Sequence, residues 1–392
     1  MANCLSDVRE ANKRLIYQCI RENKQITLTE LERMTSLSRP TIVSLVRTME
    51  AEGHVIQNGQ RPSSGGRSPM LYSINARAFY AMGIDFEFPT VRMAISDLEG
   101  ELLFSSTEKY PVDAHKDEVL KLLCDQIEAL LVQSEIDRGL LLGIGLGIGG
   151  VIDRKANHSV ILERITGWED VPIGQILSDR FCVPIHICND VDLLAMAERT
   201  LCPQNTLPDM LFIAIRFGIG MAIVSNDQFL QGEGGNIGRL GHMLVDTDGP
   251  ECACGSRGCL GLYTSERAMR GMYRKLTGRE LRHMSDIIRF AQEGESAALS
   301  VLEEAGHYLG IGIVNVCNLF DTSHVVLSAP FPVDILLGNA EPALIACNTH
   351  KLQRKITVRQ SALKEENYAL GGCLLLLELA RLEQRSMFEV LF

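Results

Sequence analysis

The sequence predicts an α/β chain with an N-terminal winged helix-turn-helix domain and a two-lobed, actin-like and ribonuclease-H-like body. Two observations carry this prediction. Residues 7–53 contain three amphipathic helix patterns in succession, and two short strand patterns follow them around a glycine-rich stretch. From residue 80 onward, a series of strands, a helix and a further strand occurs twice, as expected for two similar lobes around a cleft. We expect domains at residues 1–76 and 77–385.

Helix signals define the N-terminal domain. Residues 7–21 have apolar side chains at helical spacing, and Thr27 with Glu30 forms a capping-box pattern that opens a second helix. Ser38 is a natural N-cap for a third helix, which Gly53 ends. The third helix has apolar residues at positions i, i+3, i+4 and i+7, namely Ile42, Leu45, Val46 and Met49. Two helices, a tight turn and a third amphipathic helix predict a helix-turn-helix.

The outer face of the third helix predicts contact with double-stranded operator DNA. Short hydroxyl side chains and two long cations suit a helix that lies in a major groove. The residues expected to contact DNA are Ser38, Arg39, Thr41, Ser44, Arg47 and Thr48. After this helix, the loop RPSSGGRS is interpreted as a wing, where Gly65 and Gly66 allow close approach and Arg67 enters a minor groove. A linker is the alternative, because Gly/Ser-rich composition is typical of linkers.

Charge and hydropathy limit the possible partners and location. The net charge is −11, yet residues 1–75 contain more Lys and Arg than Asp and Glu, so only this part suits nucleic acid. The chain lacks a run of eighteen apolar residues and starts with polar residues, so we expect no membrane span, no secretory signal and a cytoplasmic location. Residues 386–392, SMFEVLF, resemble a protease-site remnant of an expression tag and are left out of the functional interpretation.

A closely spaced group of metal-binding side chains lies within the sequence of the body. Three thiolates and one imidazole form a closed tetrahedral set that is typical of structural zinc and leaves no position for a catalytic water. The predicted zinc ligands are His242, Cys252, Cys254 and Cys259. Gly255 and Gly258 would let the short loop fold back on the same ion. The alternative is three free thiols beside an unrelated histidine.

The body is predicted from two strand-rich series. The first has strands at 81–87, 90–100, 101–110 and 140–147 and a helix at 117–134. The second has strands at 211–218, 221–227 and 324–329 and a helix at 300–319.

These motifs resemble the ROK family, which comprises bacterial repressors and sugar kinases. The family's GH followed by CxCGxxGC matches the predicted zinc residues, its GxGxPGxVD segment resembles residues 145–153, and its ND before a helix matches Asn189 and Asp190. In kinase members the matching aspartate is the general base of phosphoryl transfer. The resemblance, together with Arg239, assigns these residues to an effector site: Gly149, Gly150, Asn189, Asp190, Arg239 and His242.

Departures from the family pattern favour a body without kinase activity. Phe86, Glu87 and Phe88 replace the small residues of the phosphate loop, residues 217–220 lack a hydroxyl side chain, and residues 328–330 replace a glycine pair near the adenine. We therefore expect no ATP binding and no catalytic residue. Asp190 becomes a vestigial base that accepts a hydrogen bond from a ligand hydroxyl, or alternatively caps the following helix.

The predicted sugar site is altered as well. Arg239 and Gly261 stand where family members carry glutamates that bind sugar hydroxyls. This reversal of charge suggests an anionic effector, such as a sugar phosphate or a sugar acid, that Arg239 binds bidentately. The alternative is that Arg239 pairs with a neighbouring acid and the pocket binds no sugar.

The function expected from these features is that of a transcriptional repressor of carbohydrate metabolism. A homodimer, or a dimer of dimers, would present two recognition helices to DNA, and a sugar-like effector in the cleft would change its DNA affinity. Two alternatives stay open: an active or bifunctional sugar kinase, and a regulator whose body is controlled by a protein partner.

Overall fold

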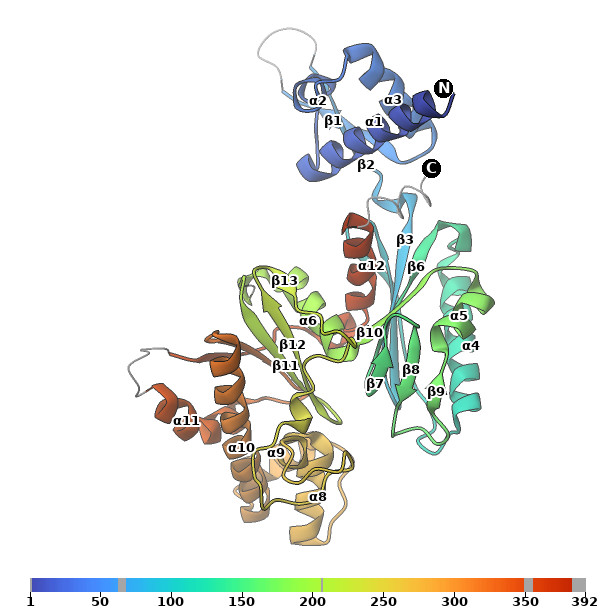
Figure 1. The fold of residues 1–392 in the computed structure, drawn as a ribbon. Helices are drawn as coiled ribbons and strands as arrows, with labels where there is room; N and C mark the ends of the chain where they lie inside the picture. The colour runs from blue at the N-terminus through green and yellow to red at the C-terminus, as the bar shows by residue number, and fades with distance from the viewer. Residues whose placement is uncertain (1, 63–67, 206, 349–354, 383–392) are drawn as a thin grey trace.

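The computed structural model describes residues 2–62, 68–205, 207–348 and 355–382. A small helical head stands at one end of a two-lobed body, and β3 leads from the head into the first lobe (Figure 1). Among the described helices, none is both long enough and apolar enough to cross a bilayer. The helical head and the two lobes, each built on a five-stranded sheet, confirm the predicted fold class.

The head is a winged helix-turn-helix. Its elements are α1 (Ala2–Asn23), α2 (Leu28–Thr35), α3 (Arg39–Ala51), β1 (Val55–Gln60) and β2 (Met70–Ile74). The predicted capping box opens α2, because Thr27 Oγ1 accepts the N–H of Glu30 at 3.3 Å and the Glu30 carboxylate accepts the N–H of Thr27 at 3.0 Å. Ser38 caps α3. The strands β1 and β2 pair antiparallel, as predicted for the wing.

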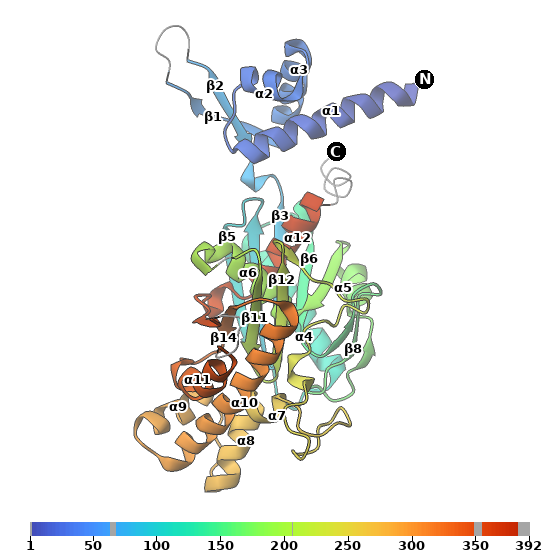
Figure 2. The ribbon, with the colours of Figure 1, turned by 60° about the vertical axis from the view of Figure 1, so that its left-hand side comes forward.

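The first helix differs in part from its predicted apolar pattern. Val8 and Leu15 are 51% and 39% exposed, whereas Ile16 and Ile20 are fully buried against the rest of the head. Lys13 is buried as well, because its Nζ pairs with Glu52 at 2.7 Å. The N-terminal half of α1 thus extends past the small core that its C-terminal half completes (Figure 2).

The first lobe is built on a five-stranded sheet of order β10-β6-β3-β4-β5. Its strands are β3 (Tyr80–Glu87), β4 (Thr90–Asp97), β5 (Leu102–Lys109), β6 (Leu141–Ile148) and β10 (Ile185–Asn189), with helices α4 (Lys116–Ser134) and α5 (Ile173–Phe181). The helices α4 and α5 cover one face. The other face packs on α6 (Asp190–Leu201) and α12 (Leu370–Leu382), where a Cβ on Gly83 would overlap the carbonyl oxygen of Ala369.

A small sheet borders the cleft side of this lobe. It consists of β7 (Val151–Asp153), β8 (His158–Ile161) and β9 (Glu169–Val171), all antiparallel. The sequence analysis did not predict these short strands.

The second lobe repeats the architecture with the sheet order β13-β12-β11-β14-β15. Its strands are β11 (Met210–Ile215), β12 (Ile219–Ser225), β13 (Gln228–Phe229), β14 (His324–Ser328) and β15 (Thr357–Gln360). Its helices are α7 (Gly261–Thr264), α8 (Glu266–Thr277), α9 (Met284–Gln292), α10 (Ser296–Phe320) and α11 (Asp334–Asn348). The helices α8, α9 and α10 pack on one face of the sheet and close a separate hydrophobic core.

Candidate ligand cleft and metal centre

The two lobes enclose a cleft with a volume of about 270 Å³. All six residues assigned to the effector site line it: Gly149, Gly150, Asn189, Asp190, Arg239 and His242. Among the described residues, Arg239 forms no ion pair and is exposed, so the neighbouring acid of the alternative hypothesis is not in contact with it.

Strand ends position the first-lobe residues of the cleft. Gly149 and Gly150 form the turn between β6 and β7, and Gly150 has φ +85°, a conformation that favours glycine. Asn189 ends β10 and caps α6, because its Oδ1 accepts the N–H of Val191 at 3.2 Å. Asp190 is then the first helical residue and points its carboxylate at the second lobe.

A buried guanidinium lines the cleft between the two lobes. Arg216 directly follows β11, and its Nη1 donates to Asp85 Oδ1 at 2.9 Å and to Asp190 Oδ2 at 3.1 Å. Its Nη2 donates to Asp85 Oδ2 at 2.7 Å and lies 2.8 Å from Glu87 Oε2. The bidentate pair with Asp85 links β3 of the first lobe to β11 of the second. No sequence signal assigned a role to Arg216.

A second arginine extends this network. Arg92 on β4 donates from Nη1 to Asp85 Oδ2 at 3.0 Å and from Nη2 to Glu365 Oε2 at 2.8 Å. Both guanidiniums also lie 5.3 Å from the centre of the Tyr368 ring. Four carboxylates and two guanidiniums therefore form one partly buried ionic network.

Burial and charge act in opposite directions on these acids. Burial opposes the ionisation of Asp85, but Arg216 and Arg92 hold the pKa of its carboxyl below its ordinary value. At Asp190 burial outweighs the charge of Arg216 and raises the pKa of the carboxyl. Because Asp190 already accepts a hydrogen bond from a guanidinium, it is poorly placed to take a proton from a substrate.

The residues that replace the family's phosphate loop border the cleft. Phe86 and Phe88 are 1% and 3% exposed and pack into the core of the first lobe. Glu87 is paired with Arg216 and Arg92 instead of standing as an isolated negative charge. The cavity beside residues 328–330 has a volume of about 20 Å³, room for about one water.

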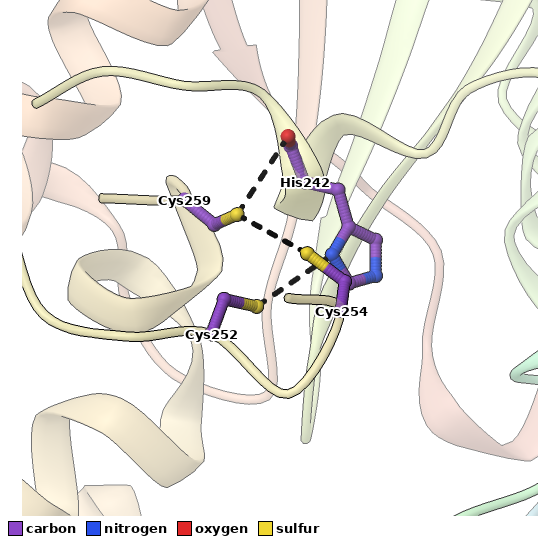
Figure 3. Close-up of side chains that lie close together, drawn as sticks. All are labelled: His242, Cys252, Cys254 and Cys259. Carbon is purple, nitrogen blue, oxygen red and sulfur yellow. Dashed lines mark hydrogen bonds between the residues drawn. The ribbon is translucent and has the colours of Figure 1, made fainter. Parts of the chain in front are cut away.

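The four predicted metal ligands form one cluster (Figure 3). The ligand atoms of His242, Cys252, Cys254 and Cys259 all lie within 4.8 Å of one another. Cys254 Sγ is 3.7 Å from Cys259 Sγ, and Cys252 Sγ is 3.8 Å from His242 Nδ1. An ion about 2.3 Å from each sulfur requires tetrahedral ligand separations of about 3.8 Å. Donor types and spacing therefore fit a four-coordinate metal.

The backbone of the loop prepares this cluster. Gly258 has φ +63°, and a Cβ there would overlap the carbonyl oxygen of Asp246. A hydrogen bond from the backbone of Ser256 lowers the pKa of Cys254 to about 6, whereas burial raises the pKa of Cys259 to about 12. A bound cation would reverse the second effect, because coordination deprotonates a thiol.

Two tyrosines fix the loop to the helices beneath it. Asp246 accepts the hydroxyl of Tyr263 at 3.0 Å and that of Tyr308 at 3.2 Å. The two rings stack with their centroids 3.8 Å apart, so the metal loop is tied to α7 and α10.

The predicted DNA-contacting residues of α3 lie on one open face of the head. Ser38, Arg39, Ser44 and Arg47 are exposed, and Thr41 and Thr48 are partly exposed. Arg39 is held by Glu32 at 3.5 Å, whereas Arg47 has no hydrogen bond or ion pair with any described residue. Gly65, Gly66 and Arg67, the predicted wing residues, lie outside the described residues.

Comparison with known proteins identifies the body. The model of the ROK family matches residues 81–371, which is most of the chain. The chain belongs to the ROK family. The head therefore precedes the part of the chain that matches the ROK family.

Two relatives that match over most of their length carry names of transcriptional regulators. A xylose repressor of Bacillus spizizenii is 31% identical over 322 residues, 82% of this chain and 82% of the relative. The DNA-binding transcriptional dual regulator NagC of Escherichia coli is 25% identical over 360 residues, 88% of this chain and 86% of the relative.

Solved structures of the ROK family share the fold. A ROK family transcriptional regulator described as a homolog of the E. coli MLC protein has a TM-score of 0.79 at 22% identity, covering 98% of this chain and 99% of its own. A ROK hexokinase from Thermus thermophilus has a TM-score of 0.62 at 26% identity, covering 76% of this chain and 97% of its own. Kinases and regulators thus share the body, and the function must be argued from the residues of the cleft.

Proposed function

We propose that this ROK chain is a DNA-binding transcriptional repressor of carbohydrate metabolism whose body binds an effector but transfers no phosphoryl group. The head (residues 1–76) would bind operator DNA, and the body (residues 77–385) would bind the effector and form a homodimer or a dimer of dimers. Support comes from the winged helix-turn-helix and from similarity to a xylose repressor and NagC over more than four fifths of the chain.

The observation that carries the proposal is the position of Arg216. Its guanidinium lies between Asp190, which matches the general base of kinase members, and Asp85, which directly precedes the altered phosphate loop. A kinase must bring a metal nucleotide and a free base to this place. Here a side chain that stays protonated holds both carboxylates, so Asp190 is not a free base.

The effector is proposed to be a sugar-like molecule with an anionic group. The cleft offers Asn189 and Asp190 as hydrogen-bonding partners for hydroxyls, and Arg239 as a cation without a partner among the described side chains. Binding changes DNA affinity only if the effector favours one lobe arrangement over the other, with a coupling of roughly 1–3 kcal/mol.

A structural zinc is proposed to hold His242 at this cleft. The ion would bind to His242 and to the three thiolates of the loop, and would have no catalytic position left. When bound, it would fix the loop that carries the histidine, in addition to the anchor that Asp246 provides.

DNA binding is tested with the full chain and the promoter of its own gene. We expect binding that weakens steeply with salt, with a slope of about −0.9 in log affinity per phosphate contacted. Arg47→Ala should weaken it, and Arg274→Ala, an exposed body residue paired with Glu280, should not. DNA affinity that does not depend on salt would contradict the proposal and favour a regulator controlled by a protein partner. The same holds if Arg47→Ala binds DNA as tightly as the wild type.

Kinase activity is tested with a panel of sugars and ATP in a coupled assay. We expect no turnover above background for the wild-type chain. Turnover in the wild type that Asp190→Asn removes would establish the alternative of an active or bifunctional kinase.

A further inference from the structure

We infer that the cleft contains an anion subsite in which Arg164 of the first lobe and Arg267 of the second hold one phosphate or carboxylate beside the ring of Phe217. The inference rests on the proposed function and deepens it. It names the group by which the effector is recognised and the contact through which binding closes the cleft.

Phe217 brings the two guanidiniums together. Arg164 Cζ lies 3.8 Å from the centre of the Phe217 ring, and Arg267 Cζ lies 5.4 Å from the same centre. The two Cζ atoms are therefore at most about 9 Å apart. A tetrahedral anion that accepts hydrogen bonds from a guanidinium keeps its central atom about 4 Å from Cζ. One anion contacts both arginines at any Cζ separation up to about 8 Å, which covers most of this range, and all three side chains line the cleft.

Both arginines have N–H groups that are available for a ligand. Within the described part of the chain, neither Arg164 nor Arg267 forms an ion pair or a hydrogen bond, in contrast to the saturated Arg216. Stacking on an aromatic ring uses the face of a guanidinium and leaves the N–H groups at its edge available. These groups point to an acceptor that the protein itself does not provide.

Among the described residues, no acid forms an ion pair with Arg164. Burial lowers the pKa of Arg164, and Arg270 and Arg216 add to this effect, against Glu87 and Glu266. Neither acid is close enough to Arg164 to form an ion pair. Burial also raises the pKa of Glu266 to about 7, which weakens its negative charge beside Arg164. A bound anion would supply the missing negative charge.

The subsite spans the two lobes. Arg164 lies between β8 and β9 of the first lobe, whereas Phe217 follows β11 and Arg267 lies in the first turn of α8 in the second (Figure 1). Without a ligand, two like charges meet across the cleft and oppose its closure. An anion between them converts this repulsion into two attractive contacts. An anionic effector therefore bridges the two lobes, which a neutral sugar cannot do through this subsite.

The test uses the full chain and four probes: glucose, glucose 6-phosphate, glucuronate and inorganic phosphate. Binding is measured by calorimetry and by the emission of Trp168, the one tryptophan of the sequence, which lies four residues beyond Arg164. We expect at least one anionic probe to bind, with an affinity that falls about tenfold or more in Arg164→Gln and in Arg267→Gln. Arg164→Lys should lose part of the affinity, since it keeps the charge without the planar donors. Arg274→Gln, on the outer side of the same helix α8, is the control and should bind like the wild type.

The outcomes separate this inference from the proposed function. Phosphate and carboxylate sugars that bind equally well identify charge as the recognised feature, and a preference for one identifies the group. If no anionic probe binds at millimolar concentration, or if both glutamine variants bind the probes like the wild type, the subsite does not exist. Operator binding, measured separately, would then still support the regulator. If the wild-type chain binds an anionic probe but not operator DNA, the proposed function as a regulator is overturned and the anion subsite stands.

Discussion

Substitution of Arg216 by methionine tests the ionic network that joins the two lobes. Methionine keeps a long apolar side chain but has neither charge nor hydrogen-bond donors. Asp85 is completely buried and would retain only Arg92 from the described network. Removing one partner of a buried ion pair costs about 3–5 kcal/mol, because the other charge stays buried. Since Arg92 still contacts Asp85, we expect a loss near the lower limit, about 3 kcal/mol.

Thermal unfolding followed by calorimetry measures this loss. For a body of this size, roughly 2 °C of melting temperature corresponds to 1 kcal/mol, so the transition of the body should fall by about 6 °C. Arg289→Met is the matched control, because Arg289 forms an exposed ion pair with Glu293 in α9 that is worth about 0.5 kcal/mol. The double variant Asp85→Asn/Arg216→Met should regain part of the stability, since it removes both buried charges.

Two results would refute this reasoning. One is a melting temperature of Arg216→Met within about 1 °C of the wild type, since a loss of about 3 kcal/mol corresponds to a fall of about 6 °C. The other is a double variant that loses the sum of the two single effects, because independent losses would mean that the side chains do not act as one network.

The same network sets the direction of a pH effect. Arg216 and Arg92 hold the folded pKa of Asp85 below its unfolded value of about 3.9, even though burial acts against them. The stabilisation by Asp85 is therefore fully present above about pH 4 and is lost as pH falls through the folded pKa. In Arg216→Met the lowering is weaker, so acid unfolding of the body should begin at a higher pH than in the wild type.

Three further predictions concern the head, the metal loop and the anion subsite. Arg47→Ala should lower operator affinity by about tenfold in fluorescence anisotropy, as expected for the loss of one DNA contact worth roughly 1–3 kcal/mol. Gly258→Ala should abolish stoichiometric zinc in metal analysis, because its Cβ would overlap Asp246, whereas Gly271→Ala in α8 has open space and should retain zinc. Glucuronate should bind more tightly as pH falls from about 8 to 6, because protonation of Glu266, with its pKa of about 7, removes a competing negative charge. Calorimetry should find this pH dependence absent in Glu266→Gln.

Local signals explain why most elements could be predicted from the sequence. The capping box at Thr27 and Glu30 and the cap at Ser38 depend on residues three positions apart, which a sequence displays directly. The metal cluster is similar, since its three cysteines lie within one short loop. The strands of the small sheet β7-β8-β9 escaped prediction because they are three or four residues long and show no clear alternation.

Long-range contacts explain what the sequence analysis missed. Arg216 was interpreted only as part of a strand pattern. Its partner Asp85 lies 131 positions away, so their contact leaves no local signal in the sequence. Arg92 and Glu365 are separated by 273 positions. For Arg216, the signal that could have found it is a cation at the end of an otherwise apolar strand, because a buried charge requires a partner. The outward position of Val8 and Leu15 was also missed, since helical periodicity does not reveal how far a small core extends.

The geometry around Arg216 also decides which contact an effector can exchange. Asp85 holds the guanidinium with two hydrogen bonds in a completely buried place, so displacing Arg216 from it would leave a buried charge without its main partner. Asp190 receives one longer bond, at 3.1 Å, and also lines the open cleft. A ligand hydroxyl can replace that single bond at small cost while the bond pair to Asp85 stays intact. An effector can therefore bind Asp190 while Arg216 and Asp85 still join the two lobes. Closure of the cleft can then depend on the anion contact rather than on a loss of the Arg216–Asp85 pair.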